Sequence, residues 1–308
     1  MLRLRAYAQL VRLPNVFTAL ADIGLGGLAA GALTADAPPA VWQTFGFLLL
    51  ASACLYCSGM VWNDIFDLEQ DQLERPFRPL PSGKIQRAQA VRLAGGLLAL
   101  GLVFAGLAGW DGERLRWTPF VLAGILAGLI LLYDGALKRT WLGPVGMGAC
   151  RFFNVLLGLS VTAGPFGTWG LVLALAVGTY IAGVTWFART EAGTSDKEGL
   201  TAAAFVMLAG LVLAIPLPAF TAERQAPVRT SILFVPLLVA YGFALGIPVS
   251  RAIQHPSPAR VQAAVKMAVL GLIVFDAILA TGLAGEWGLV LLVLLPPALY
   301  LGRWLYST

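Results

Sequence analysis

Apolar residues in this chain are gathered in long runs that are separated by short polar segments. A helix needs about 20 predominantly apolar residues to cross the hydrocarbon core of a bilayer. Ten runs reach about this length. The ends of the last four are the least well defined, because prolines interrupt or end them. We therefore predict an all-α, polytopic transmembrane bundle of nine to ten spans. The candidate spans are 14–34, 42–62, 89–109, 117–137, 143–163, 167–188, 200–220, 231–250, 262–283 and 287–305.

Basic residues fall mainly on one side of these spans. If the N-terminus is cytoplasmic, 16 of the 21 Lys and Arg residues lie in cytoplasmic segments, four lie outside, and Arg151 lies within a span. The positive-inside rule therefore predicts a multi-pass protein of a bacterial-type inner membrane or equivalent, with both termini cytoplasmic. The arginine-rich start is similar to a signal n-region. The run behind it is long enough to span, so we predict a retained first helix.

Composition agrees with a membrane protein. Hydrophobic residues make up 58% of the chain and charged residues 12%, whereas soluble domains have about 45–50% and about 25%. The net charge of +5 follows from basic cytoplasmic loops and gives no reason to expect a nucleic-acid partner. Cys54, Cys57 and Cys150 lie in apolar runs, where we interpret them as small buried residues. A single histidine, His255, makes no zinc site by itself.

Two connecting segments are longer than the others, and both are predicted to be cytoplasmic. They cover about 63–89 and 189–200 and hold most of the carboxylates that are not on the outer side. No soluble appendage or linker divides the chain. We therefore predict a single integral membrane domain, 1–308, in which these two loops form a cytoplasmic cap.

The first loop begins where an apolar helix ends. If the helix continues for two more turns, Asp64, Asp67 and Asp71 lie at i, i+3 and i+7 on one face. Like charges on one face destabilise a helix, and a hard divalent cation with oxygen ligands would neutralise them. The cations that follow are Arg75, Arg78 and Lys84. Because arginine and lysine bind phosphate oxygens, the loop predicts a magnesium–diphosphate site.

A family resemblance strengthens this interpretation. Asn63-Asp64-x-x-Asp67-x-x-x-Asp71, followed by Arg75-Pro-x-Arg78-Pro-Leu-Pro-Ser-Gly, resembles the first aspartate-rich signature of the UbiA superfamily of intramembrane prenyltransferases. Arg12-Leu-Pro-Asn15 opens the first span as in that family, and Tyr133-Asp-Gly-Ala-Leu-Lys138 resembles its tyrosine–lysine element after span four. The resemblance covers about residues 8–200, and the remainder is similar only as membrane helices.

The resemblance implies a bundle of about nine spans around a cavity, with lateral access for lipid substrates. It implies transfer of an isoprenoid chain from a prenyl diphosphate to a hydrophobic or aromatic acceptor, with Mg²⁺ as cofactor. The implied catalytic residues are Asp64, Asp67, Tyr133 and Lys138, with Tyr133 near the allylic carbon. The metal candidates are Asp64, Asp67, Asp71, Glu191 and Asp196. The resemblance and the charge pattern together indicate the diphosphate-binding candidates, which are Asn63, Arg75, Arg78, Lys84, Arg151 and Asn154.

The second loop departs from the family pattern of two aspartates four residues apart. Glu191 takes the first place, Ser195 stands four residues on, and Asp196 stands five on. A loop could still bring Glu191 and Asp196 to one metal, or the second metal site is lost. The stretches Arg-Thr-Glu-Ala-Gly and Arg151-Phe-Phe-Asn154 are most similar to the EboC-like branch of the superfamily.

Three charged residues lie well inside predicted spans, away from the span ends: Asp22, Arg151 and Asp276. Such residues are costly in hydrocarbon and usually face a cavity or a partner. Arg151 and Asn154 lie one turn apart, and we predict that they line the cavity. For Asp22 and Asp276, a structural pair and a functional role both stay open.

Two other function classes compete with prenyl transfer. A CDP-alcohol phosphotransferase also uses aspartates at a span mouth, but the signature that Asp134-Gly135 would begin does not continue. A lipid-diphosphate-binding transporter or accessory membrane protein would bind prenyl diphosphate and Mg²⁺ without releasing diphosphate, and the altered second loop keeps this alternative open. The pattern leaves the acceptor, the chain length and the oligomeric state open.

Overall fold

The computed structural model describes residues 2–189, 196–223 and 230–305, and these form helices joined by short connections. In chain order the helices are α1 (Leu2–Leu10), α2 (Leu13–Ala29), α3 (Pro39–Phe66), α4 (Leu68–Glu74), α5 (Arg87–Gly109), α6 (Thr118–Gly135), η1 (Leu137–Arg139), α7 (Gly143–Leu159), α8 (Gly167–Ala188), α9 (Lys197–Ala214), η2 (Leu217–Glu223), α10 (Phe234–Gln254), α11 (Pro258–Ala284), η3 (Gly285–Leu294) and α12 (Leu295–Trp304). Within these ranges the only β pairing is an isolated bridge between Trp110 and Leu115. The predicted all-α class is confirmed.

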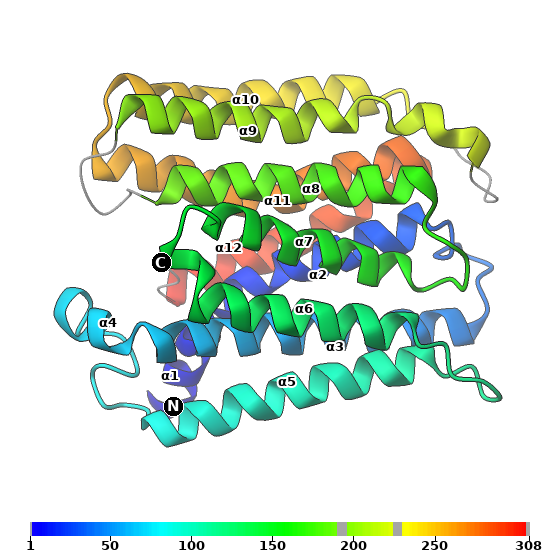
Figure 1. The fold of residues 1–308 in the computed structure, drawn as a ribbon. Coiled ribbons are helices and arrows are strands. Elements are labelled where there is room, and N and C mark those ends of the chain that lie inside the picture. The colour runs from blue at the N-terminus through cyan, green and yellow to red at the C-terminus, as the bar shows by residue number, and fades with distance from the viewer. Residues whose placement is uncertain (1, 190–195, 224–229, 306–308) are drawn as a thin grey trace.

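The long helices run side by side along a common direction (Figure 1). Helix α3 packs on α5, and α8 packs on both α7 and α9. Helix α2 lies among α3, α7, α11 and α12 and contacts each of them. The main apolar core runs between these helices through residues such as Leu55, Leu157, Leu173 and Phe275, none of which is exposed.

The helices also confirm a multi-pass membrane protein. Within the described ranges, seven helical stretches are long and apolar enough to cross a bilayer: Pro39–Phe66, Arg87–Gly109, Thr118–Gly135, Gly167–Ala188, Lys197–Phe220, Phe234–Gln254 and Pro258–Trp304. Helices α2 and α7 are apolar but shorter, at 17 residues each. The last stretch contains two predicted spans, which meet at Gly285 (φ 66°), where α11 ends.

Helices α1 and α4 lie at one end of the bundle, where α12 also ends (Figure 1). We call this the motif end, because it carries Asn63 and α4, and we call the opposite end, which carries the 110–117 connection, the far end. At the motif end a second apolar cluster joins α1 to α3 and α5 through Leu10, Val61, Ile65 and Ala90. This cluster fixes α1 beside the end of α3.

The junction between α1 and α2 is formed by Arg12. Its backbone is left-handed, with φ 47° and ψ 52°, and it is the only non-glycine residue with positive φ in the described part of the chain. Pro14 at the start of α2 favours a new helix at this point. A left-handed conformation costs a side-chain-bearing residue about 1–3 kcal/mol, so the surrounding contacts must hold Arg12 in place.

The helix that carries the aspartates is interrupted. We expected it to continue for two more turns, but α3 ends at Phe66 and α4 begins at Leu68, with Asp67 in the bridge region at φ −96° and ψ 6°. The hydrogen bonds of the helix persist across the break, from Asp67 N to Asn63 O (3.0 Å) and from Asp71 N to Asp67 O (2.8 Å). Three aspartates therefore remain on consecutive turns.

Candidate functional site

Asp64 and Asp71 share one guanidinium. Arg78 Nη1 lies 2.6 Å from Asp71 Oδ2 and 3.7 Å from Asp64 Oδ1, and all three side chains are buried. The chain after α4 folds back so that Leu80 and Ile85 pack in the motif-end cluster, and this places Arg78 against the aspartates. Two of the predicted metal ligands are thus in contact with one of the predicted diphosphate ligands.

Asp67 has a different set of partners. Lys138 Nζ lies 2.8 Å from Asp67 Oδ1, and Arg139 Nη2 lies 3.5 Å from the same oxygen. Both cations belong to η1, the short turn that follows α6. The predicted tyrosine–lysine element is therefore brought against the predicted aspartate motif.

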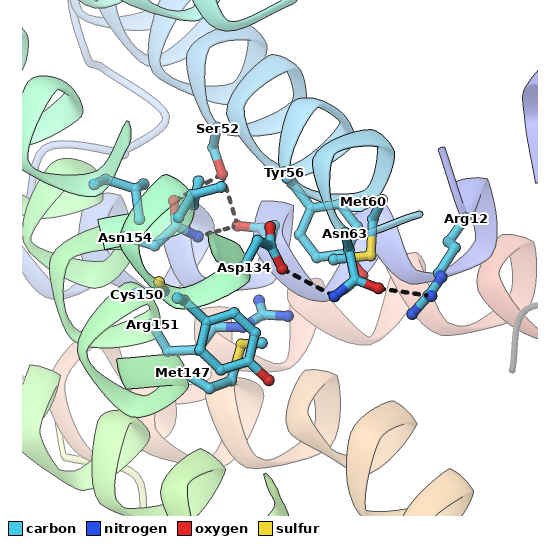
Figure 2. Close-up of a pocket in the computed structure, with 15 residues that line it drawn as sticks. Arg12, Ser52, Tyr56, Met60, Asn63, Asp134, Met147, Cys150, Arg151 and Asn154 are labelled. Carbon is cyan, nitrogen blue, oxygen red and sulfur yellow. Dashed lines mark hydrogen bonds between the residues drawn. The ribbon is translucent and has the colours of Figure 1, made fainter. Parts of the chain in front are cut away.

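Arg12 reaches into the same group. Its Nη2 donates to Asn63 Oδ1 at 3.3 Å (Figure 2). It also donates to Asp64 Oδ1 at 3.2 Å. Burial opposes the charge on Arg12, but Asp64 and other neighbours more than offset it, so the pKa of the guanidinium is raised. The sequence pointed to Arg12 only through the Arg-Leu-Pro-Asn stretch and gave it no role.

Asp134 is a site residue that sequence reasoning missed. Its Oδ1 accepts a hydrogen bond from Asn63 Nδ2 at 2.9 Å (Figure 2) and lies 4.0 Å from Lys138 Nζ. The side chain is 4% exposed. The available signal in the sequence was its position next to Tyr133 and four residues before Lys138, a spacing at which side chains of a continuous helix lie close together.

Arg12, Asn63 and Asp134 of this group border a cavity of about 160 Å³ that extends into the bundle. Its motif-end lining is polar and consists of Arg12, Asn63, Tyr133 and Asp134. Its middle is mainly apolar and includes Gly59, Met60, Leu126, Ile130, Met147 and Cys150. Its deep end is polar again, with Ser52, Arg151 and Asn154. Ser52 and Asn63 both lie on α3, about 16 Å apart along the helix axis.

Arg151 at the deep end forms an ion pair within the bundle. Its Nη1 donates to Asp22 Oδ2 at 3.0 Å and its Nη2 donates to Thr18 Oγ1 at 2.8 Å. The guanidinium carbon lies 5.5 Å from the centre of the Tyr56 ring, in the range of a cation–π contact. Arg151 thus lines the cavity, as predicted, with its charge already matched by Asp22.

Asn154 completes this deep network. Its Oδ1 accepts from Ser52 Oγ at 2.8 Å, and its Nδ2 donates to Asp22 Oδ2 at 2.8 Å (Figure 2 labels Ser52 and Asn154). On α11, the buried carboxyl of Asp276 lies beside that of Asp22. The two in-span aspartates are therefore neighbours, and the hydrogen bonds of the network join α2, α3 and α7.

Other predicted site residues lie apart from this group. Arg75 is half-buried and Lys84 is exposed, and neither side chain forms an ion pair or hydrogen bond with the residues that the structure describes. Asp196 Oδ2 accepts from Gly199 N at 3.0 Å and caps the start of α9. Glu191 lies outside the described residues, so its assignment to a metal stays a prediction.

The donor chemistry fits a hard divalent cation. In the described ranges, no three His, Cys, Asp or Glu side chains converge as a ready-made metal site. Mg²⁺ requires fewer, because one or two carboxylates and the phosphate oxygens of a substrate usually hold it. Asn63 and Asp64 offer two oxygens that lie against the same nitrogen of Arg12. Here the cationic side chains stand where a metal ion would supply positive charge.

The fold and the site define a multi-pass membrane protein whose cavity opens onto carboxylates and cations. A sequence profile described as the UbiA prenyltransferase family matches residues 25–259, about three quarters of the chain. The chain belongs to the UbiA prenyltransferase family. The predicted family is confirmed at this level.

Individual relatives agree with the family. A digeranylgeranylglyceryl phosphate synthase of Methanocaldococcus jannaschii is 36% identical over 104 residues, which cover 33% of this chain and 35% of that protein. The match to other synthases of this name varies in extent. It covers less than half the length of several of them and 65% of the length of the one from Sulfurisphaera tokodaii.

Solved structures support the fold. A digeranylgeranylglyceryl phosphate synthase aligns with a TM-score of 0.65 at 22% identity, covering 93% of this chain and 100% of that one. A UbiA homologue from Archaeoglobus fulgidus, solved bound to GPP and Mg²⁺, aligns with a TM-score of 0.68 at 14% identity, covering 92% and 99%. The UbiA-type fold that the resemblance implied is confirmed.

Proposed function

We propose that this chain transfers an isoprenoid group from a prenyl diphosphate to an acceptor within the membrane. The observation that carries the proposal is a group of carboxylates and cations beside the polar end, or mouth, of a cavity whose middle is apolar. Arg12 and Asn63 line that end, and they are joined to Asp64, Asp67 and Lys138 through direct contacts or through Asp134. A prenyl diphosphate has the same division, because a charged head is joined to a hydrocarbon chain.

The residues of the mouth would bind and stabilise the diphosphate as it leaves. The allylic carbon–oxygen bond breaks, the electron pair leaves with the diphosphate, and the acceptor bonds to the allylic carbon and loses a proton. Arg12, Arg78 and Lys138 would supply positive charge to the leaving oxygens. Tyr133 would lie beside the reacting carbon, where an apolar wall that includes Met60 and Met147 keeps water away.

Mg²⁺ would act at Asn63, Asp64 and Asp67, with Asp71 behind them. When bound, it neutralises charge on the diphosphate and so favours its departure. The cationic side chains that now contact these oxygens would then turn to the diphosphate. UbiA homologues from Archaeoglobus fulgidus were solved with Mg²⁺ together with GPP or DMAPP, which supports this cofactor. Glu191 and Asp196 remain our candidates for a second metal ion.

A lateral groove offers lipid substrates a route from the bilayer. It measures about 780 Å³ and lies between α1, α5 and α12 at the motif end. A thin wall separates it from the cavity, since Tyr56 lines the cavity while Cys57 lines the groove, and Arg12 lines the cavity while Leu13 lines the groove. Movement at the α1–α2 junction would connect the two spaces.

The acceptor belongs to the same proposal. Several relatives are named digeranylgeranylglyceryl phosphate synthases, so a prenylated glyceryl phosphate is the first acceptor to test. The sequence around Glu191 and Arg151 is most similar to the EboC-like branch. Aromatic and other hydrophobic acceptors are therefore the next to test.

The membrane topology also belongs to the proposal. We propose one integral domain over 1–308 with nine to ten spans and with the motif end in the cytoplasm. Ser82 and Glu113 are exposed and lie in connections at the motif end and the far end. Ser82→Cys would be labelled by an impermeant thiol reagent only in inverted vesicles, and Glu113→Cys only in right-side-out cells. The reverse pattern contradicts the orientation.

Diphosphate release by purified protein in lipid nanodiscs tests the activity. Farnesyl, geranyl and geranylgeranyl diphosphate are supplied with and without Mg²⁺, with geranylgeranylglyceryl phosphate or a membrane lipid extract as acceptor. We expect Mg²⁺-dependent release, with prenylated product, that is lost in Asp67→Ala. Binding of the diphosphate without release would favour the transporter or accessory alternative, which the altered second loop keeps open.

A further inference from the structure

Asp134 contacts two predicted site residues at once. Located near the end of α6, it is buried and meets Asn63 of α3 and Lys138 of η1 through one oxygen, Oδ1. Neither the aspartate motif nor the tyrosine–lysine pair contains it. In Figure 2 its carboxyl points at the Asn63 amide, whose other end points at Arg12.

The Asn63 amide has two chemically different ends. Nδ2 can only donate hydrogen bonds, and Oδ1 can only accept them. An ionised carboxylate only accepts, so Asp134 bonds to Nδ2 and turns Oδ1 away from itself. Oδ1 then faces Arg12 Nη2, which also contacts Asp64 Oδ1. The result is that two oxygens are directed to one cationic group.

This orientation matters for a metal ion, because Mg²⁺ binds oxygen ligands. A flipped amide would present Nδ2 to the metal and remove one ligand. Residues that orient metal ligands through a hydrogen bond typically change metal affinity about 10–100-fold when they are replaced. A carboxylate at 134 fixes the amide, whereas an asparagine there could pair with Asn63 in either orientation.

We propose that Asp134 is a positioning residue that fixes the Asn63 amide with Oδ1 toward the diphosphate and its divalent cation. It acts on the metal ion through Asn63 and is not itself a metal ligand. The inference rests on the proposed function, because it presumes that the mouth of the cavity binds a cation together with a diphosphate.

Metal binding, measured without turnover, tests the inference. The full chain in nanodiscs is titrated with Mn²⁺ in the presence of inorganic diphosphate, and free Mn²⁺ is followed by electron paramagnetic resonance. We expect Asp134→Asn to weaken Mn²⁺ binding about 10-fold. Ser58→Ala is the matched control. It removes a buried hydrogen bond from α3 to Ala94 O of α5 and should leave Mn²⁺ affinity unchanged.

A reciprocal exchange provides the decisive variant. In Asn63→Asp/Asp134→Asn, the amide at 134 donates to one oxygen of the carboxylate at 63, and the other oxygen still faces Arg12. The charge of the pair and its hydrogen bond are conserved. We therefore expect the double variant to bind Mn²⁺ at least as tightly as the wild type.

The outcomes separate the inference from the proposed function. If the wild type does not bind Mn²⁺ in a diphosphate-dependent way, the proposed function fails, and this inference fails with it. If the wild type binds and Asp134→Asn binds equally well, only the inference is wrong. It is also wrong if the exchange does not restore binding. Should Asp134→Asn fail to fold, the exchange decides alone: wild-type binding supports the inference, and loss of folding or binding overturns it.

Discussion

The ammonium of Lys138 and the carboxylate of Asp67 lie 2.8 Å apart, although they come from the ends of different helices. Arg12 and Arg78 make similar contacts with Asp64 and Asp71. The carboxylates that we expect to bind a metal are therefore neutralised by the cations that we expect to bind a diphosphate. Under the proposed function, the carboxylates would turn to the metal ion and the cations to the diphosphate, so that the charges of the site would remain paired.

Replacing Asp67 should abolish most of the activity. Asp67→Asn keeps the shape of the side chain but removes the charge that pairs with Lys138. We expect at least a 100-fold loss in diphosphate release, or about 2.7 kcal/mol of transition-state stabilisation. Glu69→Gln, which alters an exposed carboxylate two residues along the chain, is the control and should retain activity. Equal losses in both variants would contradict a specific role for Asp67.

Replacing Arg78 should lower the stability of the protein, whereas replacing Arg75 should weaken diphosphate binding. Arg78→Met leaves two buried carboxylates, Asp64 and Asp71, without this guanidinium, and breaking a buried pair typically costs about 3–5 kcal/mol. We expect a large loss of thermal stability in detergent. Arg75→Met removes a half-buried side chain and should leave the melting temperature unchanged while weakening diphosphate binding. A stable Arg78→Met protein would show that the ion pairs are not needed for folding.

Arg151 allows a structural role to be separated from diphosphate binding. Arg151→Met strands Asp22 as an unpaired charge inside the bundle, so we expect strong destabilisation. Asp22→Asn/Arg151→Met removes both charges and should recover much of the lost stability, which thermal unfolding would measure. If Arg151 also binds diphosphate, this double variant folds but binds diphosphate more weakly. Unchanged binding would restrict Arg151 to the Asp22 ion pair.

Arg116 at the far end should matter for stability alone. Its guanidinium donates to Ala108 O at 3.2 Å and to Ser160 O at 3.3 Å, and so joins the ends of α5 and α7. Arg116→Ala should lower the free energy of unfolding by about 1–3 kcal/mol without changing the Mg²⁺ dependence of release. Arg114→Ala, at an exposed neighbour, should change neither. A change in Mg²⁺ dependence would contradict the assignment of the reaction to the motif end.

The sequence predicted the helices well where their apolar runs were long. The run 167–188 coincides with α8, and 89–109 differs from α5 (Arg87–Gly109) only at its start. It predicted the aspartates because their spacing follows the helical period. The break at Asp67 was not predicted, since hydrophobic periodicity does not report a single residue in the bridge region.

Contacts between distant segments were beyond sequence reasoning. The pairing of Asp134 with Asn63 depends on the way α6 lies against α3, and no local pattern encodes it. Asp22 and Arg151 were each recognised as ionisable residues inside spans, but the ion pair between them appears only when α2 packs on α7. The role of Arg12 requires a left-handed backbone, which is unusual for an arginine and has no local pattern that predicts it.

That backbone has a mechanical consequence. The guanidinium of Arg12 contacts the Asn63 and Asp64 oxygens, and its main chain lies in the short covalent link between α1 and α2. A force or a fused domain that shifts α1 would rotate this one residue and pull its side chain from the site. Glycine there would relax the backbone but lose the guanidinium, so a single position must satisfy both demands.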